Sequence, residues 1–329
     1  MRGDNSIDEV GGPWVPLSPG QLTARRAAQR RQRRRRRMTT LAMMVVVVVA
    51  VVLVGVTSGG GSRTAAGAGR PAVAGQRHGS GAGSAHRARS QVPDSVNDLG
   101  VLEHKQVGGV LAYTPYVRLT TRRRRDLALT LDDGPGPYTS KIIDILKRER
   151  AVATFFTIGD QARSYPRLVA AVARAGSEVG DHTETHAYLQ RVSSTEQASQ
   201  IEDAAEAIRH AGAPSPSLFR PPYGSFDATT LSILHQQRLL MVLWSVDTSD
   251  YARPGTPEIV FTALSAASPG AIILMHDGGG DRAETVAALP AIIRGLRRRH
   301  FHLVTVSQLV AADPPPRHQP PPQPLSGIG

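Results

Sequence analysis

The sequence predicts an α/β domain folded as a distorted (β/α)7-8 barrel, and three observations support this prediction. From residue 126 onward, short apolar runs alternate with longer amphipathic stretches, which is the pattern of successive β/α units. Seven such runs fall within residues 126–312, a length sufficient to bury an ordinary core. Polar clusters follow five of the runs, at the strand ends where barrels of this kind assemble their chemistry.

The expected strands are short runs rich in β-branched and aliphatic residues: 127–131, 153–158, 178–181, 218–219, 239–246, 271–275 and 302–306. The expected helices are the amphipathic stretches between them: 141–148, 166–175, 196–210, 228–237, 257–267 and 284–298. Thr256 before Pro257 reads as a helix N-cap, and Gly176 and Gly212 follow two helix ends. Ahead of these elements, residues 101–117 predict a further strand or hairpin, and the pattern does not choose between the two.

The N-terminal third carries the basic character of the chain. Residues 1–125 hold 21 Lys and Arg against 6 Asp and Glu, whereas residues 126–329 hold 18 against 21. A run of arginines ending at Arg37 precedes the uncharged segment 38–57, which is long enough to cross about 30 Å of hydrocarbon. The positive-inside rule then places residues 1–37 in the cytoplasm as a basic tail. We therefore expect a transmembrane signal anchor at 38–57 and a single-pass protein of the cell membrane, with its folded domain outside the cytoplasm.

Two alternatives apply to this N-terminal region. A cleavable signal peptide, with small residues at 65–68 for a peptidase, would make the protein secreted. The arginine run could instead bind nucleic-acid phosphate, but its position beside an apolar span favours a topological role. We expect no nucleic-acid partner.

The remaining organisation follows from composition. Residues 58–95 are rich in Gly, Ala and Ser and predict a flexible linker, and residues 313–329 predict a Pro-rich disordered tail. The folded domain is expected at 96–312, with its core at 120–312. The chain has no cysteine, which excludes disulfides, a thiolate nucleophile and Cys-ligated metal.

The five polar clusters lie at one expected end of the barrel: 130–134 (TLDDG), 181–186 (DHTETH), 220–224 (RPPYG), 244–251 (WSVDTSDY) and 274–277 (LMHD). Each alone has a structural explanation, since adjacent aspartates usually mark a turn or an N-cap. Their occurrence together, at matching strand ends, indicates an active site.

The residue types suit a metal site. Two imidazoles, His182 and His186, with one carboxylate are suitable ligands for Zn²⁺ or a similar divalent ion, and three protein ligands leave a position open. Either Asp132 or Asp133 can be the carboxylate ligand, and the other can then act as a base toward an attacking water.

Other residues complete an acyl-transfer chemistry. A backbone N–H can stabilise the oxyanion formed when water attacks an acyl carbon. His276 is the best candidate to protonate a leaving amine, with Asp250 or Asp247 to orient it. Arg220 has the geometry to hold a carboxylate base. The sequence therefore predicts metal-assisted hydrolysis of an acyl group.

In order and approximate spacing, the five clusters resemble the motifs of the NodB-type polysaccharide deacetylases, carbohydrate esterase family 4, over residues 120–312. The resemblance implies that Asp132 is the general base, that Asp133, His182 and His186 bind the metal, and that Arg220 positions Asp132. It further implies oxyanion binding by the backbone N–H of Tyr223, an acetyl pocket lined by Leu274, and a general acid, His276, tuned by Asp250. Tyr251 stands where many members have Trp, at a wall of the substrate groove.

The family implies a hydrolase that removes N-acetyl groups from N-acetylglucosamine-containing polysaccharide. For an exported domain we expect peptidoglycan as the substrate, Zn²⁺ as the metal (Co²⁺ or another divalent ion being the alternatives), and a monomer. The alternative functions are an O-acetyl esterase on xylan or another glycan, a non-catalytic surface glycan-binding protein, an adaptor acting through the arginine run, and an N-deacylase of a small molecule.

Overall fold

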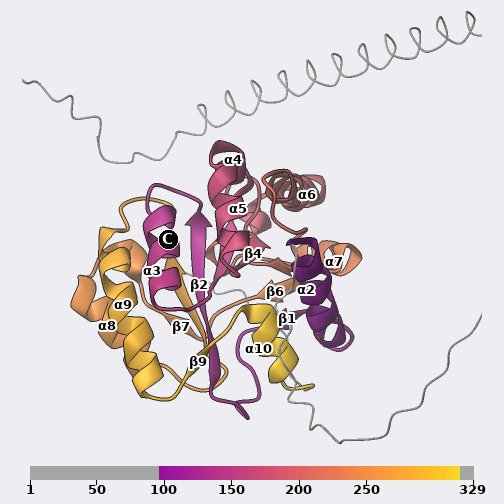
Figure 1. Cartoon of the computed structure of the whole chain (residues 1–329). Coiled ribbons are helices and arrows are strands. Elements are labelled where there is room, and N and C mark those ends of the chain that lie inside the picture. The colour runs from indigo at the N-terminus through magenta and orange to yellow at the C-terminus, as the bar shows by residue number, and fades with distance from the viewer. Residues whose placement is uncertain (1–95, 319–329) are drawn as a thin grey trace, which may run out of the picture. The chain divides into compact units, whose positions relative to one another are not determined.

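The computed structural model describes residues 96–318, which form alternating strands and helices (Figure 1). In chain order the helices and strands are α2 (Val96–Leu111), β1 (Tyr116–Val117), β2 (Asp126–Gly134), α3 (Thr139–Arg148), β3 (Thr154–Thr157), α4 (Gly159–Ser164), α5 (Pro166–Arg174), β4 (Glu178–Asp181), α6 (Ser194–His210), β5 (Leu218–Phe219), α7 (Ala228–Gln237), β6 (Leu240–Val242), β7 (Val246–Asp247), α8 (Thr256–Ser265), β8 (Ile272–His276), α9 (Ala283–Arg298), β9 (His302–Leu303) and α10 (Val306–Ala312). Three short 3₁₀ helices, η1 (Leu189–Arg191), η2 (Pro222–Gly224) and η3 (Asp250–Ala252), lie in the loops.

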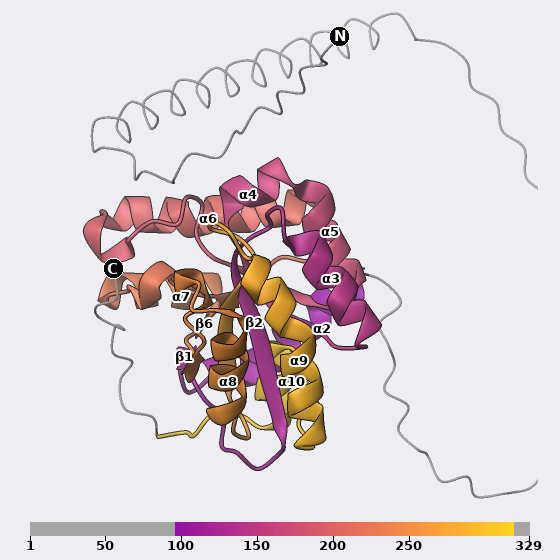
Figure 2. The ribbon, with the colours of Figure 1, turned by 90° about the vertical axis from the view of Figure 1, so that its left-hand side faces the viewer.

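The strands form one sheet whose ladders are parallel, in the order β1-β6-β5-β4-β3-β2-β8-β7, with β9 paired to the start of β2. In this order β6 lies next to β1 at one end of the sheet, and β7 lies at the other end. Only three residues of the chain separate β6 from β7. Since so short a segment spans at most roughly 14 Å, the two ends of the sheet must approach each other. The sheet is therefore curved into an incomplete barrel, with β2 running through its middle (Figure 2).

Alternation along the strands separates two apolar cores. Leu127, Leu129 and Leu131 of β2 pack outward with residues of α3, α5, α8 and α9. Ala128, on the opposite face of the same strand, packs inside the barrel with Phe156, where residues of α2 and α10 also contribute. The inward face of β2 continues through Thr130 to Asp132, so the barrel interior changes from apolar to polar toward the C-terminal ends of the strands.

The parallel α/β architecture is confirmed, and so are all six predicted helices, each to within two residues at each end. Gly176 and Gly212 do follow the ends of α5 and α6, with φ of +77° and +90°. The N-cap of α8 is Gly255 and not Thr256, which is the first helical residue.

Three predictions for individual elements were wrong. Residues 101–111 belong to helix α2, whose Val107 and Val110 are buried one helical turn apart against the interior core, and only Tyr116–Val117 form a strand. The single strand predicted at 239–246 is two strands, because β6 pairs with β1 and β5 while β7 pairs with β8. The strand predicted at 302–306 stops at Leu303, and Val306 begins α10.

The segment expected to be a disordered tail, 313–329, starts with residues that pack. Asp313 is buried and accepts hydrogen bonds from Thr120 and Thr121 and from the backbone of Arg123. The hydroxyl of Tyr113 donates to the Pro315 carbonyl. The chain is therefore attached to the domain for several residues beyond α10.

The expected cytoplasmic tail, signal anchor and linker, residues 1–37, 38–57 and 58–95, lie outside the described residues. Within residues 96–318, none of the helices has the length and apolar character needed to cross a membrane.

Candidate active site

The sheet register brings the predicted clusters to one level. Asp132 on β2 is the Cα partner of His276 on β8, and on the other side Thr157 of β3 is the partner of Asp181 of β4. The backbone N–H of Arg220, just after β5, donates to the carbonyl of that same Asp181. Because parallel strands end at the same edge, residues from 24 to 144 positions apart in the chain meet there.

A bulge at the end of β2 turns two adjacent carboxylates to the same side. The register with β3 shifts between Asp132 and Gly134, leaving Asp133 as an extra residue with a φ of +72°. In a regular strand neighbouring side chains point to opposite faces. Here both carboxylates face His182, whose Nε2 lies 3.8 Å from Asp132 Oδ2 and 3.4 Å from Asp133 Oδ1.

The two histidines lie on the irregular loop that follows β4. Thr183 and His186 have left-handed backbone, with φ of +65° and +59°, and both histidine rings lie near Asp133 at the end of β2. His182 Nδ1 lies 2.7 Å from the Arg220 carbonyl and must donate to it, which leaves Nε2 as a lone pair facing Asp133. His186 Nδ1 lies 3.0 Å from the Tyr223 hydroxyl, and its Nε2 lies 3.1 Å from Asp133 Oδ1.

Asp133, His182 and His186 have the donor set and the spacing of a divalent metal site. One ligand atom from each lies within 4.8 Å of the others, and Asp133 Oδ1 is buried without a hydrogen-bond partner among the described residues. Two ligands of a tetrahedral Zn²⁺ site, each about 2.1 Å from the ion, lie about 3.4 Å apart, close to the observed nitrogen–oxygen separations. The residues therefore fit a divalent ion.

Arg220 is fully buried and holds Asp132. Its Nη1 donates to Asp132 Oδ1 at 2.7 Å and to Thr130 Oγ1 at 2.8 Å, and its Nε donates to the Val242 carbonyl at 3.1 Å. Of the guanidinium nitrogens, only Nη1 reaches the Asp132 carboxylate. Burial lowers the pKa of Arg220 from its ordinary value, and the neighbouring Asp132 acts against this shift.

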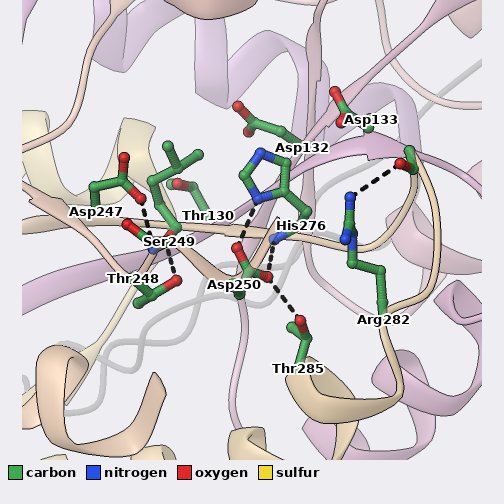
Figure 3. A network of polar contacts seen from close by, with 12 residues as sticks. Thr130, Asp132, Asp133, Asp247, Thr248, Ser249, Asp250, His276, Arg282 and Thr285 are labelled. Carbon is green, nitrogen blue, oxygen red and sulfur yellow. Dashed lines mark hydrogen bonds and ion pairs between the residues drawn. The ribbon is translucent and has the colours of Figure 1, made fainter. Parts of the chain in front are cut away.

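His276 and Asp250 form a tightly bound pair (Figure 3). His276 Nδ1 lies 2.7 Å from Asp250 Oδ1, while Asp250 Oδ2 accepts from the backbone N–H of His276 and from Thr285 Oγ1. Burial alone would lower the pKa of His276, but the hydrogen bond and charge of Asp250 outweigh it and raise the pKa to about 9. The same pair lowers the pKa of Asp250, against the effect of its burial.

Asp247, the other candidate to orient His276, has a different contact. Its Oδ1 accepts from the backbone N–H of Ser249 at 2.7 Å, and burial raises its pKa. Of the two aspartates, only Asp250 touches the His276 ring in this structure.

The residues predicted to contact substrate lie around this centre. Tyr223 has a φ of +60°, is 43% exposed, and packs against the His186 ring, while burial beside Asp133 raises the pKa of its hydroxyl. Tyr251 is 36% exposed and meets the His276 ring edge-on at 5.4 Å. Leu274 is buried on β8, two residues before His276 on the same strand face.

Three further residues of the site region were given no role from the sequence. Tyr188 stacks on Tyr223 with ring centres 4.5 Å apart. Glu184 is buried and pairs with Arg163 of α4 at 2.9 Å, fixing the histidine loop. Asp277 is buried beside Gly134, with its pKa raised by burial to about 7. Glu184 and Asp277 each had a sequence signal, as charged residues inside two of the five polar clusters.

The sequence of the chain is similar to the sequences of known deacetylases. A family model described as polysaccharide deacetylase matches residues 120–242. A peptidoglycan-N-acetylglucosamine deacetylase of Bacillus cereus is 38% identical over 187 residues, covering 56% of this chain and 87% of that protein. A chitooligosaccharide deacetylase of a Bradyrhizobium strain is 39% identical over 198 residues, covering 56% and 90%.

The fold is shared with solved structures. The crystal structure of the Bc1960 peptidoglycan N-acetylglucosamine deacetylase matches with a TM-score of 0.58 and 33% identity, covering 59% of this chain and 92% of that chain. The sequence resemblance is thus confirmed at the level of both sequence and fold. The chain belongs to the polysaccharide deacetylase family, carbohydrate esterase family 4.

Proposed function

We propose that this protein is a metal-dependent hydrolase that removes N-acetyl groups from N-acetylglucosamine units of peptidoglycan, with Zn²⁺ as its metal. One observation carries the proposal. Asp132, held by Arg220, lies between the Asp133, His182 and His186 cluster and the buried His276 and Asp250 pair. A base, a metal-binding set and an acid therefore surround one position.

When bound, a divalent ion at Asp133, His182 and His186 would polarise the acetyl carbonyl and lower the pKa of the attacking water. Asp132 takes a proton from that water while the oxygen of the water bonds to the acyl carbon. Arg220 fixes Oδ1 of Asp132, which leaves Oδ2 on the His182 side to accept the proton. The backbone N–H of Tyr223 is the donor proposed for the resulting oxyanion.

His276 completes the reaction as a general acid. Because Nδ1 is committed to Asp250, the other ring nitrogen carries the proton that can be delivered, and it is turned toward the side of Asp132 (Figure 3). A pKa of about 9 keeps the ring protonated at neutral pH. The carbon–nitrogen bond breaks as the amine takes this proton, and acetate and a free amino sugar are released.

The identity of the glycan is drawn from the relatives. Those named above are described as peptidoglycan and chitooligosaccharide deacetylases, both acting on N-acetylglucosamine. O-deacetylation of xylan remains a second candidate, since the same residues can hydrolyse an ester. The presence of base, ligands and acid in contact distance favours turnover over glycan binding alone.

The test is acetate release by the purified protein from peptidoglycan strands, N-acetylglucosamine oligomers and acetylated xylan. The expected result is release from the first two substrates that stops with a chelator and returns with Zn²⁺ or Co²⁺. Release that persists in excess chelator would contradict metal dependence. Acetate release from acetylated xylan alone would show that the protein is an O-acetyl esterase and not an N-deacetylase.

The location of the protein is also a proposal. Residues 1–37 would lie in the cytoplasm, residues 38–57 would cross the membrane, and the enzyme, as a monomer, would act on glycan outside. The uncharged apolar segment that follows five arginines supports this arrangement. Protease protection of intact cells or vesicles, read with an antibody to the catalytic domain, would decide it.

A further inference from the structure

A stack of side chains runs from the metal-binding set to the surface of the loop after β4. The His186 and Tyr223 rings meet edge to face at 4.6 Å, Tyr223 and Tyr188 stack at 4.5 Å with their planes 15° apart, and the Arg191 guanidinium lies 4.3 Å from the Tyr188 ring centre. Since Tyr223 covers one face of Tyr188, the guanidinium must cover the other.

The position of Arg191 is fixed by its neighbours. Leu189 is fully buried in the core beneath, and the Arg191 backbone N–H donates to the Tyr188 carbonyl. Gln190 Oε1 accepts from Ser225 Oγ at 3.1 Å, which ties η1 to the segment just after Tyr223. Arg191 is therefore held at a defined place near the site, although its side chain is exposed.

The Arg191 guanidinium has no carboxylate partner inside the described part of the chain. Arg163 and Arg253, which also lie on segments beyond the strand ends, pair with Glu184 at 2.9 Å and with Asp281 at 3.7 Å. Arg191 forms no ion pair within residues 96–318. A guanidinium over an aromatic ring keeps its N–H donors free, and their fork matches a carboxylate.

We infer that Arg191 is a specificity-determining residue that binds a carboxylate on a neighbouring sugar of the glycan, with Tyr188 as its positioning residue. The inference rests on the proposed function and narrows the substrate class. A carboxylate distinguishes a strand that contains N-acetylmuramic acid from a neutral N-acetylglucosamine oligomer. The aspartates that crowd the centre disfavour an acidic substrate, so a cation at the surface near the site gives such a strand its anchoring point.

The experiment compares three substrates with the full-length protein loaded with Zn²⁺. They are peptidoglycan strands freed of stem peptides, the same strands with their carboxylates converted to methylamides, and an N-acetylglucosamine pentamer. We expect Arg191→Gln to lower kcat/KM about three- to tenfold on the free-carboxylate strands, through KM, and to leave the other two substrates unchanged. Arg191→Lys should restore part of the loss, and added salt should reduce the preference of the wild type.

The matched control is Arg253→Gln, which removes another exposed arginine and should not change the substrate ratio. Tyr188→Ala should weaken the preference as Arg191→Gln does, whereas Tyr188→Phe, which keeps the ring, should retain it. An unchanged ratio in Arg191→Gln, or an equal loss on all three substrates, would overturn the inference while the deacetylase activity stands. Wild-type protein that releases acetate from none of the three substrates would instead overturn the proposed function.

Discussion

The carboxylate of Asp250 holds both the ring and the backbone of His276, with Oδ1 2.7 Å from Nδ1 and Oδ2 2.9 Å from the backbone nitrogen. The two residues are separated by 25 intervening positions in the chain and meet only because η3 lies against the end of β8. One side chain thus sets the position of the proposed acid and its protonation.

Replacing Asp250 by Asn should lower the pKa of His276, which the hydrogen bond and charge of Asp250 now raise to about 9. The protonated acid would then be lost at a lower pH, so the alkaline limb of kcat/KM should move down by at least about one pH unit. Activity at pH 8 should fall about 10- to 100-fold. Thr285→Val, which removes a single bond to Asp250, should shift the limb less; an unmoved limb in Asp250→Asn would show that another group sets it.

Replacing His182 and His276 separately should divide metal binding from acid catalysis. His182→Ala should lose bound metal and activity together, because it removes one of three ligand atoms. His276→Ala should lower kcat about 10²- to 10⁴-fold while the metal content stays at the wild-type value. The check is to measure the metal content and the rate of each variant, with His210→Ala, at an exposed histidine, as the control. A full metal content in His182→Ala would show that His182 is not a metal ligand.

Replacing Arg220 by Met should destabilise the protein strongly, because it leaves the buried Asp132 carboxylate without its partner. Breaking a buried ion pair in this way costs about 3–5 kcal/mol in the free energy of unfolding. Urea denaturation at pH 7 measures it, and Arg253→Gln, which breaks an exposed pair, should cost less than about 1 kcal/mol. Equal, small losses in the two variants would mean that Asp132 is solvated more than its 3% exposure indicates.

Glu184 should matter for metal affinity although it does not face the metal-binding set. It joins the histidine loop to Arg163 of α4, while the backbone N–H groups of Gly159 and Asp160 bind the carbonyls of Thr183 and Glu184. Glu184→Gln should weaken metal binding about tenfold by loosening His182 and His186. Competition for the metal with a chromogenic chelator measures this affinity. Arg163→Gln should weaken metal binding to a similar extent. The double variant should lose little more, because the two substitutions remove the same interaction.

Glu178 offers a stability test away from the site. It lies buried at the start of β4 and accepts from Thr154 Oγ1 and from the backbone and hydroxyl of Ser307 in α10. Burial raises its pKa, and these hydrogen bonds only partly offset the effect. A raised pKa means that the folded state holds the proton of Glu178 more tightly than the unfolded chain does. The stability that protonated Glu178 contributes is therefore lost as the pH rises above 4.5, the ordinary pKa of a glutamate.

Glu178→Gln should therefore flatten the dependence of stability on pH, since Gln cannot ionise. The free energy of unfolding of the wild type should fall more between pH 5 and pH 8 than that of the variant. Parallel denaturant titrations at the two pH values measure the difference. Identical slopes would show that Glu178 does not titrate differently in the folded and unfolded states.

The sequence by itself determined the alternation of strands and helices and the placing of polar clusters after the strands. These features depend on near neighbours: the period of apolar residues, the glycines after α5 and α6, and the parallel arrangement that brings strand ends to one edge. That is why the six predicted helices and the meeting of Asp132, His182, Arg220 and His276 were accessible without a structure.

Only the tertiary structure decided how those groups are used. The bulge that turns Asp133 beside Asp132, the double contact of Asp250 with the ring and the backbone of His276, and the Tyr223, Tyr188 and Arg191 stack depend on register and loop geometry between distant segments. The same holds for residues 239–246, which divide into two strands because they cross from one end of the sheet to the other. The local period of apolar residues does not predict such contacts, because they are stabilised by partners far along the chain.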